Sequence, residues 1–175
     1  MLLHRKTSRM KRQKKLFDFA SAKYIGVLCS PLDELSTGQL KVFLYYLSKK
    51  DIKYTVFGYF DEKKIPENFL YWKGINYITK NDINFFFIPK SPIVNEFIHE
   101  PFDMLINCSM EQYFPLEYIA QLSKASCKVG IMRDDKVSYD LMIDIQKNKN
   151  IEYFLSNLKE YLSNLISPKS EQIKT

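Results

Sequence analysis

The chain has 175 residues, of which 46% are hydrophobic and 15% aromatic, enough for one domain with a sizeable core. No apolar run approaches the ~20 residues of a membrane span, and no apolar segment of a signal peptide follows the basic amino terminus. We therefore expect a cytoplasmic protein. The net charge is +6, from 26 Lys and Arg against 20 Asp and Glu.

The excess positive charge is concentrated in the first fifteen residues, which hold seven Lys or Arg and no acid. Without those seven, the chain has 19 basic against 20 acidic residues. We expect a basic arm over residues 1–19, able to form a helix because Leu3, Met10 and Phe17 are seven residues apart. After the arm we expect one domain over residues 20–166 and then a polar tail over residues 167–175. The basic side chains of the arm are Arg5, Lys6, Arg9, Lys11, Arg12, Lys14 and Lys15.

The first part of the expected domain alternates between a strand and a helix. Residues 23–30 form a short apolar run that predicts a strand. Ser36 and Gln39 have the spacing of a capping box, and the apolar residues between 40 and 47 repeat at helical intervals. Residues 54–60 are rich in β-branched and aromatic side chains and predict a second strand.

The middle of the chain is less regular. For residues 61–90 we expect one or two short strands among irregular segments, because Pro and Gly interrupt short aromatic runs. Ser91 and Pro92 then resemble a cap and the first position of a helix. Pro101 should end that helix.

The second half of the domain has the clearest pattern. Residues 102–109 (FDMLINCS) predict a buried strand, and Pro115 should open a helix. Two more strands are expected at 127–132 and 139–145. A last helix should run from Ile151 to Leu165, where apolar residues recur every three or four positions.

Apolar strands that alternate with helices predict an α/β fold with three layers. We expect a mostly parallel sheet with helices on both faces, of the Rossmann-like or flavodoxin-like kind. In such a sheet, ligands bind at the carboxyl ends of the strands.

The chain also resembles an uncharacterised family of short bacterial α/β proteins, a domain of unknown function, over about residues 20–165. The resemblance rests on FDMLINCS, PLEYIAQLSKASCKVGI and YDLMIDI, and on NDINFFFIPKS in the middle of the chain. Phe85 stands where a Trp is expected in the middle motif. The resemblance implies a bacterial, cytoplasmic α/β protein whose members commonly carry a basic leader. It implies no activity and no catalytic residue.

No catalytic, metal or cofactor signature emerges. The five glycines form neither a P-loop nor a GxGxxG dinucleotide motif. Cys29, Cys108 and Cys127 are widely spaced in apolar surroundings, which favours reduced buried thiols. His99 lies where it can contact the last carbonyls of a helix. We therefore expect no metal, no cofactor and no catalytic residue.

Five polar residues follow predicted strands, at positions where a small molecule could bind. The alternative is that they cap helices and form turns, as Ser, Asp and Asn commonly do at such junctions. The candidates for a small-molecule pocket are Ser30, Asp33, Asn107, Ser109 and Arg133.

The arm gives the leading functional hypothesis. Mixed Arg and Lys suit phosphate groups, so we expect the arm to bind RNA or a ribonucleoprotein such as the ribosome. An anionic membrane surface is an alternative partner, although the apolar stripe of the arm is narrow for that purpose. An arm that only aids solubility is a third possibility. A runner-up of another class is an enzyme or sensor with a small molecule at the strand ends.

Overall fold

The computed structural model of the chain describes residues 12–30, 33–65, 69, 72, 74–133 and 139–164. Six parallel strands form one sheet in the order β3-β2-β1-β4-β5-β6. This order reverses direction between β1 and β4, as in doubly wound Rossmann-type sheets. The strands are β1 (Tyr24–Cys29), β2 (Lys53–Phe60), β3 (Ile75–Thr79), β4 (Met104–Asn107), β5 (Cys127–Ile131) and β6 (Leu141–Ile143).

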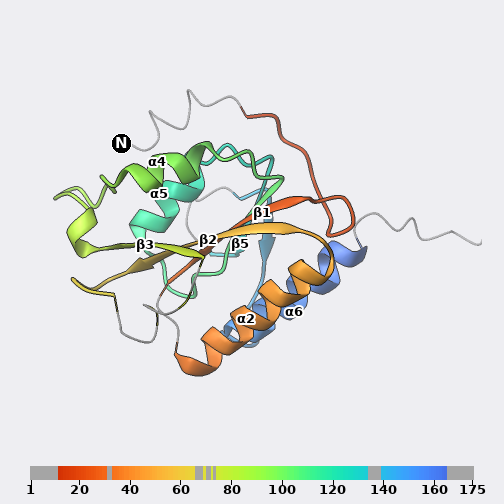
Figure 1. Cartoon of the computed structure of the whole chain (residues 1–175). Coiled ribbons are helices and arrows are strands. Elements are labelled where there is room, and N and C mark those ends of the chain that lie inside the picture. Colours follow the sequence, from red (N-terminus) through yellow and green to blue (C-terminus); the bar gives the residue numbers. More distant parts are fainter. Residues whose placement is uncertain are drawn as a thin grey trace, which may run out of the picture.

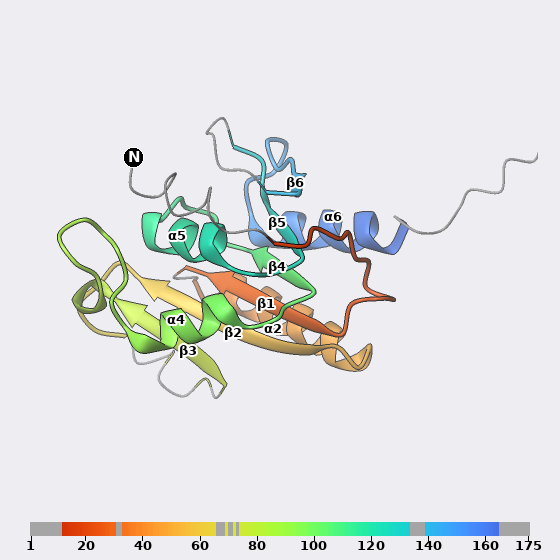
Figure 2. The ribbon, with the colours of Figure 1, turned by 90° about the horizontal axis from the view of Figure 1, so that it is seen from above.

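Helices cover both faces of the sheet, as the alternating pattern predicts (Figures 1 and 2). On one face lie α2 (Glu34–Lys49) and α6 (Ile151–Asn164). On the other lie α4 (Pro92–His99) and α5 (Phe114–Leu122). The expected three-layer α/β architecture is confirmed.

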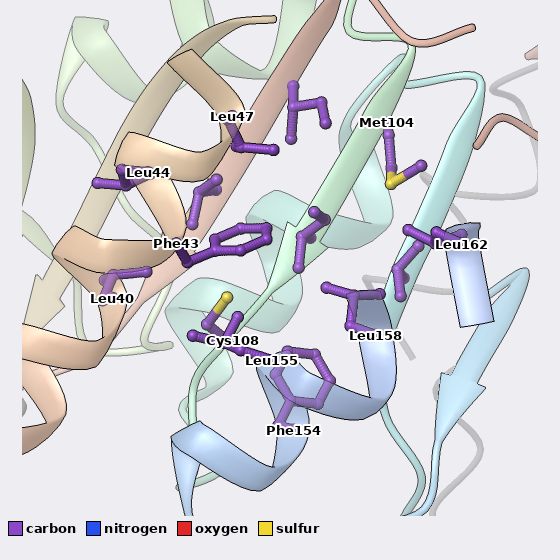
Figure 3. Close-up of a cluster of buried hydrophobic side chains, with 14 of the residues drawn as sticks. Leu40, Phe43, Leu44, Leu47, Met104, Cys108, Phe154, Leu155, Leu158 and Leu162 are labelled. Carbon is purple, nitrogen blue, oxygen red and sulfur yellow. The ribbon is translucent and has the colours of Figure 1, made fainter. Parts of the chain in front are cut away.

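Each helix layer has its own hydrophobic core against the sheet. Figure 3 shows the layer in which α2 and α6 pack over β4. Leu40, Phe43 and Leu47 of α2 are almost wholly buried, because residues three or four apart lie on one helix face. The second layer joins the apolar faces of α4 and α5 to the opposite side of the sheet. The central strands are therefore buried on both sides, which explains their uninterrupted apolar sequences.

The start of α2 differs from the capping box expected at Ser36 and Gln39. Asp33 is the N-cap residue, and its carboxylate accepts a hydrogen bond from the Ser36 amide at 2.7 Å. Ser36 therefore lies inside the first turn. Asp caps a helix as well as Ser does. The sequence was therefore compatible with a cap at Asp33 as well as at Ser36.

The irregular middle of the chain contains one strand, β3, and a short 3₁₀ turn, Lys80–Asp82. The turn is closed by a reciprocal pair of contacts. The Asp82 carboxylate accepts bonds from the Thr79 amide at 2.8 Å and the Thr79 hydroxyl at 3.0 Å, while the Thr79 hydroxyl accepts from the Asn81 amide. This is a capping box that the sequence analysis missed.

The described part of the basic arm is not a free helix. Residues 12–18 have no helical structure, and Phe17 and Phe19 are buried in the core layer formed by α2 and α6. Phe19 makes edge-to-face contacts with Phe43 and Tyr46. The folded body therefore begins before residue 20, and Phe17 is a core residue instead of part of an exposed stripe.

Two glycines provide a test of this packing. A methyl group at Gly130 in β5 would lie 2.7 Å from the Tyr139 ring, whereas one at Gly38 in α2 would meet nothing within 4 Å. We expect Gly130→Ala to lower the free energy of unfolding by about 1–3 kcal/mol through overpacking. Gly38→Ala should raise it by about 0.5–1 kcal/mol, because Ala is the better helix former. Urea unfolding of both variants checks the pair, and equal effects would contradict this packing.

Candidate functional site

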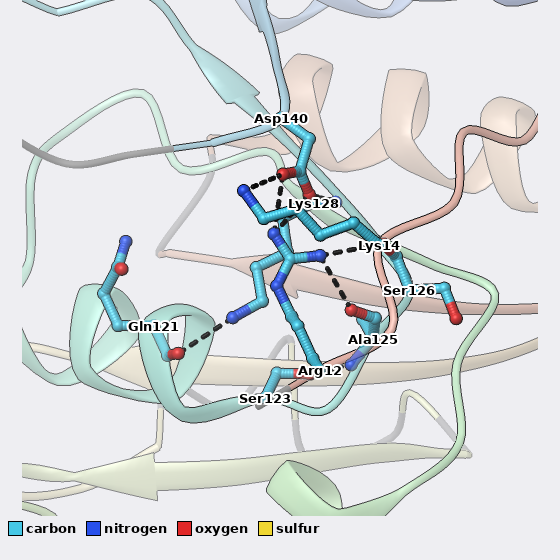
Figure 4. Close-up of polar contacts among 8 residues, drawn as sticks. All are labelled: Arg12, Lys14, Gln121, Ser123, Ala125, Ser126, Lys128 and Asp140. Atoms are coloured by element: carbon cyan, nitrogen blue, oxygen red, sulfur yellow. Dashed lines mark hydrogen bonds and ion pairs between the residues drawn. The ribbon is translucent and has the colours of Figure 1, made fainter. Parts of the chain in front are cut away.

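The base of the arm is fastened to the sheet by Arg12 (Figure 4). Its guanidinium donates to both carboxylate oxygens of Asp140, at 2.6 and 2.5 Å, and to the carbonyls of Ser126 at 2.8 Å and Ala125 at 3.2 Å. The Arg12 and Asp140 side chains are only 13% and 11% exposed. We call these four residues the Arg12 clamp. Both contacts to Asp140 come from one guanidinium nitrogen, Nη2, while the other, Nη1, bonds the two carbonyls. Because the pair is largely buried and charge-assisted, it contributes more than an ordinary surface ion pair.

The sheet positions the carboxylate of the clamp. Asp140 lies directly before β6, and its amide donates to the Lys128 carbonyl at 2.8 Å. The Lys128 amide donates in turn to the Asp140 carboxylate at 2.9 Å. Hydrogen bonds from Arg12, from this amide and from Lys14 lower the pKa of Asp140, although its burial acts in the opposite direction. Asp140 is therefore held as a carboxylate.

Two lysines of the arm follow the clamp and remain at the surface. The Lys14 ammonium lies 3.2 Å from the Asp140 carboxylate, but its side chain is 68% exposed. The Lys15 amide donates to the Ser126 carbonyl at 3.2 Å, and its ammonium lies 4.7 Å from the centre of the Phe17 ring. Both can still reach a partner. The remaining predicted contacts, Arg5, Lys6, Arg9 and Lys11, lie outside the described residues.

Arg12 has a different role from the one predicted for it. Its guanidinium already makes four hydrogen bonds within the protein, and it faces a carboxylate of the same chain. A phosphate would have to displace Asp140 to reach it. Arg12 therefore fixes the position of the arm, and the set available for a polyanion falls from seven side chains to six.

A buried lysine lies beside the clamp. Lys128 is 3% exposed, and its ammonium donates to the Gln121 carbonyl at 2.8 Å. Burial, with a smaller contribution from Arg12, lowers the pKa of Lys128 to about 7. The side-chain nitrogen of Gln121 is buried without a hydrogen-bond partner in the described part of the chain. Sequence reasoning missed this lysine, although a Lys inside the apolar run CKVGIM was a visible signal.

A hollow of about 360 Å³ opens where the arm passes the sheet. Two lysines and one aspartate contribute charge to its lining, so the surface of the hollow is only weakly positive. The lining residues are Lys14, Lys15, Leu16, Ser126, Tyr139 and Asp140.

At the carboxyl ends of the strands, the structure brings together part of the predicted pocket. The Asn107 side-chain amide, at the end of β4, donates to Glu117 at 3.2 Å and to the Tyr139 hydroxyl at 2.8 Å. The Tyr139 hydroxyl donates to the other oxygen of Glu117 at 2.9 Å. All three residues are less than 9% exposed. Burial and the nearby Glu117 carboxylate raise the pKa of Tyr139, so its hydroxyl stays protonated as a donor.

The neighbouring loop is tied to this network. Arg133 donates to the carbonyls of Ser109 at 2.7 Å and Met110 at 3.1 Å. The Ser109 amide donates to the Asn107 side-chain oxygen at 3.1 Å. Ser30 is buried after β1, and no described hydrogen bond joins it to this group. Asp33 instead caps α2, which lowers the pKa of its exposed carboxyl group.

Three of the five pocket candidates thus converge, together with Glu117 and Tyr139, which the sequence analysis missed. Glu117 is the only charged residue of α5, and a charge among mostly apolar residues was the available signal. The contacts satisfy most of the polar atoms of Asn107 internally. These contacts link the end of β4 to α5, and binding of a small molecule by these residues stays a prediction.

The thiols and His99 match their structural interpretation. All three cysteines are reduced and buried, and burial raises the pKa of Cys29 to about 12. A thiol of that pKa is a poor nucleophile near neutral pH. His99 lies with Nδ1 2.8 Å from the Asn95 carbonyl in the last turn of α4. Among the described residues, no group of three or more His, Cys, Asp or Glu is placed to hold a metal ion.

The strand order and the helices on both faces define a doubly wound α/β protein of the Rossmann type. A family model described as a family of unknown function (DUF6913) matches residues 2–165. The chain belongs to this family, and the matched region includes most of the basic arm. A search of curated proteins gave no match. Within the described residues, every helix is too short or too polar to cross a membrane.

The clamp predicts a large effect for a small change at Asp140. Asp140→Asn removes the carboxylate that accepts from the Arg12 guanidinium and from the Lys128 backbone amide, so we expect a loss of roughly 3 kcal/mol in the free energy of unfolding. Asp61→Asn is the control, because Asp61 forms a half-exposed pair with Lys80 and should cost less than about 1 kcal/mol. Denaturant unfolding at pH 7 measures both. The difference between wild type and Asp140→Asn should shrink as the pH falls through the lowered pKa of Asp140, and a difference independent of pH would contradict the clamp.

Lys128 predicts a second pH dependence of the same sign, in a higher pH range. Its pKa is about 7 in the folded protein and near 10.5 in the unfolded chain, so the unfolded state binds more protons between these values. The wild type should therefore gain stability relative to Lys128→Met as the pH rises from 7, by up to about 1.4 kcal/mol per pH unit. Paired urea titrations at pH 6, 7, 8 and 9 measure this difference. A constant difference across the series would show that Lys128 remains charged in the folded state.

Proposed function

We propose that this protein docks on a polyanion, with RNA or a ribonucleoprotein such as the ribosome as the first candidate. The observation that carries the proposal is the distribution of charge: seven of 26 basic residues lie in the first fifteen positions, and the rest of the chain is close to neutral. The contacts are assigned to six residues of the arm: Arg5, Lys6, Arg9, Lys11, Lys14 and Lys15.

The Arg12 clamp supports this proposal by giving the arm a fixed base. Arg12 and the buried Phe17 hold the intervening Lys14 and Lys15 at the surface, next to the hollow. Side chains that are already positioned lose less conformational entropy when a partner binds. The docking surface is therefore a basic strip whose attachment to the body is defined.

The chemistry of the strip favours contacts to phosphates over contacts to bases. Arg makes bidentate bonds to phosphate and Lys acts as a point charge. Neither contact depends on the base sequence of the nucleic acid. The aromatic residue closest to the basic residues, Phe17, is buried in the core. Six phosphate contacts imply a slope of about −5 in log affinity against log salt on a duplex.

A charge variant of the full chain tests the proposal. In the arm variant, Arg5, Lys6, Arg9 and Lys11 become Gln, so about two contacts remain and the salt slope on duplex RNA should fall to about −2. The control variant replaces four exposed lysines of the body, Lys49, Lys50, Lys147 and Lys149, by Gln. It changes the net charge equally and should keep a slope near −5. Fluorescence anisotropy between 50 and 200 mM salt measures all three proteins.

Two results would count against RNA as the partner. If the arm and control variants lose affinity equally, net charge and not the arm governs binding. If wild-type protein fails to cosediment with ribosomes or RNA but floats with anionic vesicles, and the arm variant does not, the polyanion is a membrane surface.

A second candidate is an enzyme or sensor that binds a small molecule at the strand ends. Its supporting observation is that Asn107, Glu117 and Tyr139 converge where the strand order reverses, the usual ligand position in such sheets. We rank it second because these groups already bond to one another. A nucleotide or metabolite that copurifies with the arm variant would favour it.

A further inference from the structure

Three consecutive phenylalanines are exposed at the tip of the loop between β3 and α4. Phe85, Phe86 and Phe87 are 92%, 64% and 58% exposed. In Figure 2 this segment projects from the body, beyond the end of β3. Taking ~200 Å² for a whole Phe side chain, the three rings leave on the order of 400 Å² of apolar surface in water. A patch of this size on a monomer commonly marks an interaction site.

The loop is an ordered turn built around Asn84. The Asn84 side-chain oxygen accepts from the amides of Phe86 at 2.9 Å and Ile88 at 3.0 Å. The Phe87 amide donates to the Asn84 carbonyl at 2.8 Å, and the Asn84 amide donates to the Ile88 carbonyl at 3.0 Å. Four amides of the tip are therefore satisfied within the loop, which lowers the cost of moving it into an apolar medium.

The base of the loop is attached to the core. Ile83 and Ile88 pack against the hydrophobic layer under α4, Pro89 is buried, and a β-bridge joins Ile83 to Pro89. The tip thus has a fixed position relative to the sheet.

Packing within this chain does not explain why three phenylalanine rings are exposed at this turn. Phe87 has a φ of 58°, a left-handed conformation that is unfavourable for an aromatic residue and suits Gly or Asn. Neither Phe85 nor Phe86 buries its ring in the protein; they contact each other edge to face. Backbone strain and exposed aromatic surface at one turn together indicate a binding role.

The tip of the loop carries no charged side chain, whereas charged side chains occur near its base. Residues 83–89 contain no charged side chain. Exposed lysines lie near the base: Lys90 follows the loop, and Lys63 and Lys64 belong to a segment joined to the 3₁₀ turn before the loop, where the Asn81 side chain donates to the Lys63 carbonyl. Among the nearby acids, Asp61 pairs with Lys80 and Asp82 accepts from Thr79. Glu62 is exposed beside Lys63, so these three lysines exceed by three to one the nearby acids that no described ion pair or side-chain hydrogen bond engages.

We propose that this loop inserts its three phenylalanines into the interfacial layer of an anionic lipid bilayer, with Lys63, Lys64 and Lys90 at the level of the headgroups. At a membrane surface, uncharged aromatic side chains can lie against the acyl chains while basic side chains contact the anionic headgroups. The uncharged tip and the lysines near the base of this loop have the same order. Single-stranded RNA would instead require basic side chains between the rings to follow its backbone. This site is separate from the arm and does not rest on the polyanion proposal.

Vesicle binding of the full chain tests the loop. The loop variant carries Phe85→Ser, Phe86→Ser and Phe87→Asn, and Asn suits the left-handed position. The control carries Leu35→Ser, Val42→Ser and Tyr45→Ser on α2, which remove three side chains of similar exposure, 73%, 60% and 62%. In flotation with phosphatidylcholine vesicles containing 30% phosphatidylglycerol, the loop variant should bind at least tenfold more weakly than wild type. The control should bind like wild type.

The outcomes separate the loop from the arm and from other partners. The single change Phe85→Ser should weaken binding by an intermediate amount without altering thermal unfolding, since this ring is 92% exposed. The proposal fails if wild type does not float with these vesicles, if loop and control variants lose binding equally, or if only the arm variant loses it. It also fails if the loop variant loses affinity for poly(U) instead, or if sedimentation shows that the three rings hold a dimer together.

Discussion

Burial of the central strands on both faces is the constraint on which the rest of this structure depends. β1 and β4 lie in the middle of the sheet, and nearly every side chain they contribute is covered by a helix layer. Each strand therefore needs apolar residues at nearly every position, with buried polar groups such as Asn107 hydrogen-bonded, and a connection that crosses over the sheet. The helices α2 and α6 on one face and α4 and α5 on the other follow from this requirement.

The same constraint explains which parts of the fold could be predicted. Short apolar runs between turn residues, such as residues 104–106, favour buried strands, and the spacing of apolar residues from Ile151 to Leu162 favours a helix. Ser36 and Asp33 were both plausible caps for α2, because capping depends on local geometry that two positions could satisfy. The segment before β3 lacked periodicity, so only the existence of a short strand was predictable there.

The candidate site was less predictable because its key contacts join distant positions. Nothing in a single sequence connects Arg12 to Asp140, so Arg12 was grouped with the residues expected to bind phosphate. Glu117 and Tyr139 meet Asn107 only after three elements have packed. Lys128, by contrast, was visible as a charge within a buried strand, and its proximity to the clamp became apparent only in the structure. The exposure of Phe85 likewise required the structure, since an aromatic run predicts a buried strand equally well.

The arm, the polar network and the aromatic loop lie at different places in the fold, although Tyr139 of the network also lines the hollow beside the arm. The arm leaves the body at the amino ends of β5 and β6, the polar network lies at the carboxyl end of β4, and the aromatic loop follows β3 at the opposite edge of the sheet. Changes at the aromatic loop can therefore be made without altering the arm or the polar network.

The Arg12 clamp also has a consequence for biosynthesis. Its ion pair joins residues 128 positions apart, so the arm leaves the ribosome long before its carboxylate partner has been made. Throughout that interval the Asp140 carboxylate is absent from the nascent chain. During synthesis the clamp can therefore close only after residue 140 has left the ribosome.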